Sequence, residues 1–177
     1  MPAQSKYLRD FTDLSQRCHE SRGDGLSEFL EADLVKSLGW PPDVAEQWLY
    51  DHSGFSNFLV DYDGLDLTTI RWHDELVPAE SFLTIPTGPS EAGLIEEFAR
   101  NPNHWSEVRR SQGVPQHWAS HGTWLRRPLL IDRTILRPRE VGLQVIEGRT
   151  RVGVLRGFIE RGRNVAAMHP AWVARSH

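Results

Sequence analysis

The sequence predicts an α+β fold with an N-terminal helical extension, and three observations support this prediction. Apolar residues recur at helical spacing up to about residue 55, and shorter apolar runs follow. Residues 128–132 form a continuous apolar run, which is typical of a strand buried on both faces of a sheet. Near the C-terminus another short apolar run breaks at Gly148 and passes into a helical pattern. We therefore expect a helical extension over residues 1–55 and an α+β domain over residues 56–177.

The extension is expected to be mainly helical. Leucine and phenylalanine residues recur at helical spacing over residues 6–38, and Gly39-Trp-Pro-Pro42 ends that pattern. Asp43 is a suitable N-cap for a further helix that ends near Gly54.

A β-hairpin is expected next, because the hydrophobic period changes. Residues 58–62 and 67–72 have strand composition, and Asp63-Gly-Leu-Asp66 supplies a turn between them. The remaining expected elements are a strand over 81–85, a helix from Ser90, a helix capped by Asn103, a loop over 111–127, strands over 128–132 and 143–146, a helix from about Arg149 and a last strand over 165–168.

Composition limits the class of protein. The 177 residues are 39% hydrophobic and 25% charged, as in a globular domain. No apolar run approaches the roughly 20 residues that span a bilayer, and the N-terminus lacks the apolar core of a secretory signal. The single cysteine, Cys18, excludes an intramolecular disulfide and a cysteine-rich zinc site. We expect a cytoplasmic protein without a membrane partner.

The net charge of −4 conceals a strong asymmetry. Residues 1–99 hold 6 Lys and Arg against 19 Asp and Glu, whereas residues 100–177 hold 14 Arg against 5 Asp and Glu. Arginine favours bidentate recognition of phosphate or carboxylate, so the second half is suited either to an anionic ligand or to pairing with the acidic first half. The acidic half makes DNA binding an unfavoured function.

The break at Gly148 is the strongest candidate for a ligand site. A glycine there allows close backbone approach, and the helix that follows offers unpaired N–H groups to an anion. Arg149 and Arg151 add positive charge, and Thr150 adds a hydroxyl donor. Convergence of these residues with Arg126 or Arg127 on a pocket would favour ligand binding; pairing of the arginines with carboxylates of the first half would indicate a structural role.

Other polar and aromatic groups suggest weaker hypotheses. His117 and His121 have the spacing of one helical face, but no third ligand is evident, so we expect no metal site. Trp118 and Trp124 are expected either in the core or stacked on a ligand. Turn chemistry explains the acidic cluster Asp61, Asp63 and Asp66.

Residues 77–157 resemble the ParB/sulfiredoxin-like domain family. The matching segments are Val77-Pro-Ala-Glu-Ser-Phe82, Leu94-Ile-Glu-Glu-Phe-Ala99, Pro128-Leu-Leu-Ile-Asp132 and Val145-Ile-Glu-Gly-Arg-Thr-Arg151 running into Val152–Leu155. The resemblance implies a small mixed-sheet α+β core that binds nucleotide phosphates at a Gly-x-x-Arg turn. Gly148 would be the turn glycine, Arg151 the phosphate-holding arginine, and Arg149 and Thr150 the two variable positions. Some relatives are small-molecule kinases, which makes Glu147 the candidate catalytic base; pairing of Glu147 with Arg149 or Arg151 is the alternative.

The chain also departs from the family. Sulfiredoxins have a cysteine directly after the turn glycine, where this chain has Arg149, so reductase chemistry is not expected. The second asparagine-arginine motif and the helix-turn-helix of chromosome-partition members do not follow the motif helix, so a sliding DNA clamp is not expected either.

Two functions of different classes follow. The first is a nucleotide- or phosphate-binding domain, using a nucleoside triphosphate with Mg²⁺ and open to phosphotransferase or nucleotide hydrolase activity. The second is a non-catalytic protein-binding module, such as a toxin-neutralising (immunity or antitoxin) or regulatory protein, whose acidic half faces a protein partner. Whether the chain is an enzyme is left open by these patterns.

Overall fold

A single four-stranded mixed sheet forms the centre of the fold. The computed structural model describes residues 4–108 and 110–177. In spatial order the strands are β1 (Ile70–Pro78), β4 (Met168–Ser176), β2 (Leu129–Asp132) and β3 (Leu143–Glu147). β1 pairs with β4 and β2 with β3 in antiparallel fashion, whereas β2 and β4 are parallel. The predicted α+β class with a mixed sheet is confirmed.

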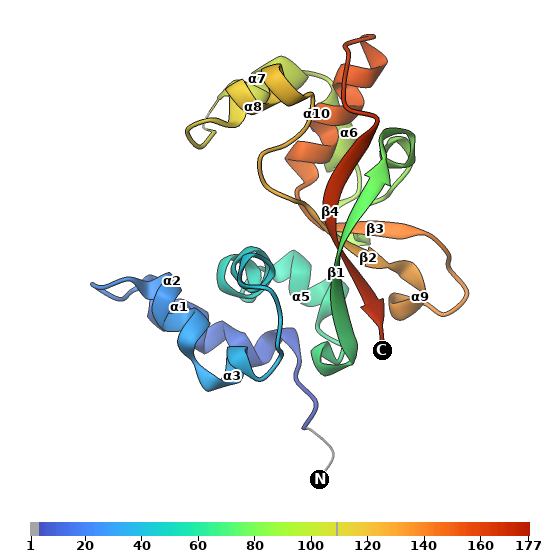
Figure 1. Cartoon of the computed structure of the whole chain (residues 1–177). Helices are drawn as coiled ribbons and strands as arrows, with labels where there is room; N and C mark the ends of the chain where they lie inside the picture. Colours follow the sequence, from blue (N-terminus) through green and yellow to red (C-terminus); the bar gives the residue numbers. More distant parts are fainter. Residues whose placement is uncertain (1–3, 109) are drawn as a thin grey trace.

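Helices lie on both sides of this sheet (Figure 1). Those before β1 are η1 (Leu8–Phe11), α1 (Thr12–His19), α2 (Gly25–Glu31), α3 (Asp33–Lys36), α4 (Pro42–Val44), the π-helix η2 (Ala45–Tyr50), α5 (Ser56–Tyr62) and η3 (Leu67–Thr69). Those after β1 are η4 (Ala79–Leu83), η5 (Pro89–Glu91), α6 (Leu94–Ala99), α7 (Pro102–Glu107), α8 (Val114–His121), α9 (Arg133–Leu136) and α10 (Arg149–Glu160). None of the helices in the described residues has the length and apolar character needed to cross a membrane.

Strand β2 separates two hydrophobic cores. Leu129 and Ile131 point into a core shared with the N-terminal helices, whereas Leu130 points into a core shared with α6, α8 and α10. All three side chains are fully buried. This two-sided burial explains why the strand lacks the polar alternation of a half-exposed strand, as predicted for residues 128–132.

The N-terminal extension is continuous with the sheet. Phe11 and Trp48 of the extension are fully buried in the same cluster as Ile146 and Ala174 of the sheet. The helices over residues 1–55 therefore form one layer of the fold, and their position brings side chains of η2 close to the start of α10.

The expected hairpin over residues 58–72 is wrong. Residues 56–62 form α5 instead, because Phe58 and Tyr62 are buried four residues apart while Val60 between them is 78% exposed. A strand would have placed all three side chains on one face. Strand structure begins only at Ile70, after the Asp66 side chain caps η3 by accepting from the Thr68 amide.

Four other expectations also need correction. Residues 81–85 are not a strand: η4 covers Ala79–Leu83, following Pro78. The expected loop over 111–127 contains α8, which lies between Gly113 and Gly122, both with positive φ, and has Pro115 in its first turn. The last strand starts at Met168 rather than at residue 165, and Asn101 rather than Asn103 caps α7.

Candidate anion-binding site at the start of α10

Gly148 makes the sharp turn between β3 and α10. Its φ is +99°, a left-handed conformation, and a Cβ built there would lie 2.5 Å from the Cβ of Pro128. Both the backbone angle and the close approach therefore require glycine. The expected helix begins at Arg149, as predicted, and runs for 12 residues.

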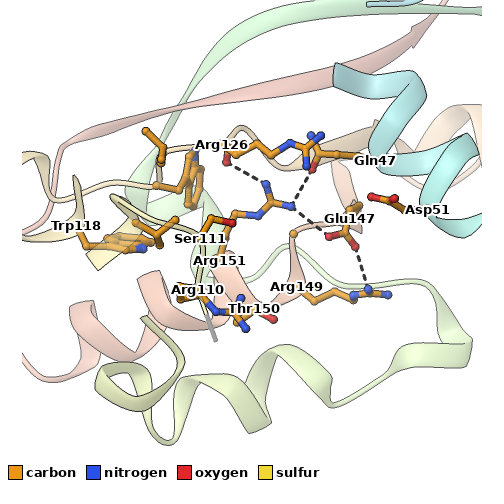
Figure 2. A pocket seen from close by; sticks show the side chains of 14 residues that line it. Gln47, Asp51, Arg110, Ser111, Trp118, Arg126, Glu147, Arg149, Thr150 and Arg151 are labelled. Atoms are coloured by element: carbon orange, nitrogen blue, oxygen red, sulfur yellow. Dashed lines mark hydrogen bonds and ion pairs between the residues drawn. The ribbon is translucent and has the colours of Figure 1, made fainter. Parts of the chain in front are cut away.

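A pocket of about 240 Å³ opens at this turn. Figure 2 shows the side chains that surround it, which come from η2 and the residue after it, from α8 and the segment before it, from the segment before β2, from the end of β3 and from the start of α10. The polar lining residues are Gln47, Asp51, Arg110, Ser111, Arg126, Glu147, Arg149, Thr150 and Arg151, and the apolar ones are Val114, Trp118, Trp124 and Leu125. The structure thus brings together all predicted site residues except Arg127.

Glu147 is held between two arginines. Its Oε2 accepts from Arg149 Nη2 at 2.9 Å, and its Oε1 accepts from Arg151 Nη2 at 3.2 Å. Arg149 also pairs with the buried carboxylate of Glu91, which comes from the acidic half of the chain. Burial alone would raise the pKa of Glu147, but the charges of Arg151 and Arg149 outweigh it and hold that pKa below its usual value.

This pairing bears on the role of Glu147 as a base. A base at neutral pH needs an accessible lone pair and a pKa close to the working pH. Here both carboxylate oxygens already accept hydrogen bonds and the pKa is lowered. The geometry suits a residue that orients Arg149 and Arg151, which was the alternative considered for Glu147.

Arg151 connects three parts of the fold. Its Nη1 donates to the carbonyls of Arg126 (3.0 Å) and Arg127 (3.1 Å), and its Nη2 donates to Oε1 of Gln47 at 2.8 Å. Its side chain is only 18% exposed. Little of its donor capacity is left for a ligand.

Arg126 and Arg127 are also paired with carboxylates of the first half. Arg126 Nε donates to Asp43 at 2.6 Å, and its Nη2 lies 2.7 Å from Glu46. Arg127 makes a bidentate pair with Asp74, at 2.9 and 3.0 Å, and does not line the pocket. Part of the charge asymmetry of the two halves is thus balanced by ion pairs between them inside one fold.

Donors of three kinds remain for an anion. The backbone amides of Arg149, Thr150 and Arg151 form the first turn of α10, and none of them donates a hydrogen bond to an acceptor in the described residues. The Thr150 hydroxyl also lacks a hydrogen bond within that part of the chain. Arg110 donates through Nε to the Val108 carbonyl at 3.1 Å and makes no ion pair within residues 4–108 and 110–177.

The remaining predicted groups lie elsewhere or in the core. His117 and His121 stack on α8 with ring centroids 4.2 Å apart, and no group of three potential metal ligands occurs in the described residues. Trp118 and Trp124 reach the pocket wall but are 3% and 2% exposed, so they are mainly core residues.

The three carboxylates of the acidic cluster over residues 61–66 bind different partners. Asp61 accepts from Ser90, Asp63 pairs with Arg9, and Asp66 caps η3. Each carboxylate therefore has a separate structural partner. Only Asp66 shows the expected turn chemistry, because Asp61 and Asp63 bind residues that are distant in the sequence.

Sequence reasoning missed Gln47, Asp51, Arg110 and Ser111 as pocket residues. The adjacent arginines before Ser111 were a usable signal, because a basic loop next to a helical N-terminus is typical of anion sites. Gln47 and Asp51 had no such signal, since only the tertiary packing of η2 against the sheet brings them to α10.

Comparisons of the chain with protein-family models, with curated proteins and with solved structures found no match in any of the three.

Proposed function

We propose that this protein binds a small phosphorylated ligand in the pocket at the start of α10. The single observation that carries the proposal is a set of donors at one wall without an acceptor among the described residues: the backbone amides of the first turn of α10 and the Thr150 hydroxyl. The guanidinium of Arg110, which makes no ion pair in that part of the chain, adds positive charge. Backbone donors at a helix N-terminus favour an anion, and the helix dipole adds about 0.3–1 kcal/mol.

The size of the pocket restricts the ligand. Sites for drug-sized ligands usually enclose roughly 300–1,000 Å³, and this pocket has about 240 Å³. A phosphate with a small substituent fits within it. A nucleoside triphosphate with Mg²⁺ remains a candidate if its phosphates occupy the pocket and its nucleoside lies outside.

The relation to the ParB/sulfiredoxin-like family is part of this proposal. The mixed sheet and the glycine turn into α10 are consistent with this relation. Arg151 matches the phosphate-holding arginine in sequence, but its guanidinium already donates to protein acceptors. We assign the phosphate to the α10 amides and Arg110 instead, and Arg149 and Arg151 to building the wall of the pocket. Because Glu147 is fully paired, we propose ligand binding as the function, without a catalytic step.

Arg110→Ala is the variant that tests the proposal. A thermal-shift panel of inorganic phosphate, ATP, ADP, CTP and GTP, each with and without Mg²⁺, identifies a ligand of the wild type. A ligand at about 100 times its Kd stabilises the native state by about 2.7 kcal/mol. We expect Arg110→Ala to weaken the binding of that ligand about ten-fold or more, since it removes a charge-assisted hydrogen bond.

Arg139→Ala is the matched control, because Arg139 is exposed on the segment between β2 and β3 and does not line the pocket. The Arg139→Ala variant should bind the ligand with the affinity of the wild type. A flat response of the wild type across the whole panel would contradict the proposal and favour the protein-binding alternative. Equal losses in the two variants would show that only the overall charge matters.

A further inference from the structure

Two charged groups of the pocket have no ion-pair partner among the described residues, and they have opposite sign. Six charged side chains line it, and four of them are ion-paired: Arg126, Glu147, Arg149 and Arg151. The other two, Arg110 and Asp51, make no ion pair within residues 4–108 and 110–177. Asp51 also accepts no side-chain hydrogen bond in that part of the chain, although it lies next to a pocket rich in arginine.

The two unpaired groups lie on opposite sides of the site. Figure 2 shows Arg110 beside Thr150, near the start of α10, and Asp51 on the far side, with Arg151 and Glu147 between them. Asp51 follows η2, whereas Arg110 follows α7. One wall is therefore suited to an anion and the opposite wall to a cation.

Asp51 is exposed to solvent and has no ion-pair partner among the described residues. Two arginines that line the same pocket bind other acceptors: Arg126 binds Asp43 and Glu46, and Arg151 binds Glu147 and Gln47. Partial desolvation at the pocket wall raises the pKa of this carboxylate, against the opposing effect of the nearby charges of His52 and Arg126, neither of which forms an ion pair with it. A cationic group of a ligand would supply that partner.

Part of the pocket lining is apolar. Val114 and Leu125 line the pocket, and Leu125 is 51% exposed. A short alkyl spacer would bury its methylene groups against these side chains.

We propose that the ligand is dipolar, with a phosphate at the α10 amides and Arg110, a short aliphatic spacer, and a protonated amine at Asp51. The inference rests on the proposed function and deepens it: Asp51 determines specificity for amine-bearing phosphorylated compounds, while the α10 wall supplies the affinity for phosphate.

Matched pairs of ligands test this proposal. Each ω-aminoalkyl phosphate, from phosphoethanolamine upward in chain length, is compared with the alkyl phosphate in which a methyl group replaces the ammonium group. Isothermal titration calorimetry at neutral pH gives the Kd of each compound for the intact protein. For the best chain length, we expect the amine to bind about ten-fold to a hundred-fold more tightly than its alkyl partner. This ratio of Kd values corresponds to the free energy of one charge-assisted hydrogen bond.

Asp51→Asn separates the amine from the phosphate. We expect this variant to bind both compounds with nearly the same Kd, and to bind the alkyl phosphate as the wild type does. Asp13→Asn, which removes an exposed carboxylate from α1 far from the pocket lining, should retain the wild-type preference. Retained preference in Asp51→Asn would overturn the proposal.

Failure of this inference can be distinguished from failure of the proposed function. If alkyl phosphates bind in an Arg110-dependent manner but no amine improves the affinity, the dipolar ligand is refuted and the phosphate site stands. If no phosphorylated compound binds, both are refuted.

Discussion

Arg151→Ala should destabilise the fold strongly, which makes it a test of the structural role assigned to the arginine network. The substitution removes donors from the carbonyls of Arg126 and Arg127, from the Gln47 amide oxygen and from Glu147. The Arg151 and Glu147 side chains are both 18% exposed, so water replaces these contacts only in part.

The magnitude follows from the groups left without a partner. Removal of one member of a buried ion pair costs about 3–5 kcal/mol, and each buried acceptor left unsatisfied costs about 1–3 kcal/mol. Arg149 still holds one oxygen of Glu147, and the pocket admits water to part of the cluster. We therefore expect the free energy of unfolding to fall by about 3–4 kcal/mol, below the simple sum.

Urea denaturation of the wild type and the variant measures this change. Arg127→Ala is the matched control, because the Arg127–Asp74 pair is bidentate but exposed, at 40% and 49%; it should cost about 0–1 kcal/mol. If Arg151→Ala lowered the free energy of unfolding by less than about 1 kcal/mol, the structural role of Arg151 would be refuted, and a ligand-binding role would be favoured.

Two further predictions concern His169 and the glycine turn. His169 is fully buried, and burial lowers its pKa to about 4 from 6.5; the unfolded chain therefore binds the proton first as the pH falls. The free energy of unfolding should decrease between pH 6.5 and about 4 by at most about 3 kcal/mol. His169→Gln, compared with the wild type by urea denaturation across that range, should show a smaller decrease, and an equal one would contradict the assignment. Gly148→Ala should lower the free energy of unfolding by about 1–2 kcal/mol because of the positive φ, and the contact of the new Cβ with Pro128 should lower it further. Gly142→Ala is the matched control: its φ is +92° and its Cβ would meet no described atom within 4 Å, so it should show only the cost of the positive φ. Similar losses in thermal or urea denaturation would show that the contact with Pro128 relaxes freely.

The segment from β2 through β3 to α10 was predictable because its local patterns are unambiguous, whereas β4 was expected at residues 165–168 and lies at Met168–Ser176. The apolar run ending at Asp132, the break at Gly148 and the helix from Arg149 each have a local cause: two-sided burial or a backbone angle that only glycine adopts readily. The α+β class followed from these elements.

The α5 helix shows where local pattern failed. Residues 58–62 contain alternate apolar residues, which fit a strand, and also an apolar pair four residues apart, which fits a helix. Packing of Phe58 and Tyr62 in the N-terminal core decides between them, and that packing depends on residues distant in the sequence, such as Trp48. The α8 helix was missed for another reason: its glycine caps and Pro115 were interpreted as loop signals.

The candidate site was half predictable. The α10 residues and Arg126 follow from the turn motif, but the state of their charges does not. Pairing of Arg149 with Glu91 and of Arg126 with Asp43 joins residues 58 and 83 positions apart. The contribution of Asp51 likewise depends on how η2 packs.

The most direct measurement of the central claim is a titration of the nitrogen-15-labelled protein with inorganic phosphate, followed by the backbone amide resonances. If the α10 amides hold the anion, those of Arg149, Thr150 and Arg151 should shift in a saturable manner, and Arg110→Ala should weaken the effect. Amides of α1, which lie outside the pocket lining, should not move. Unchanged α10 amides at saturating phosphate would contradict the account.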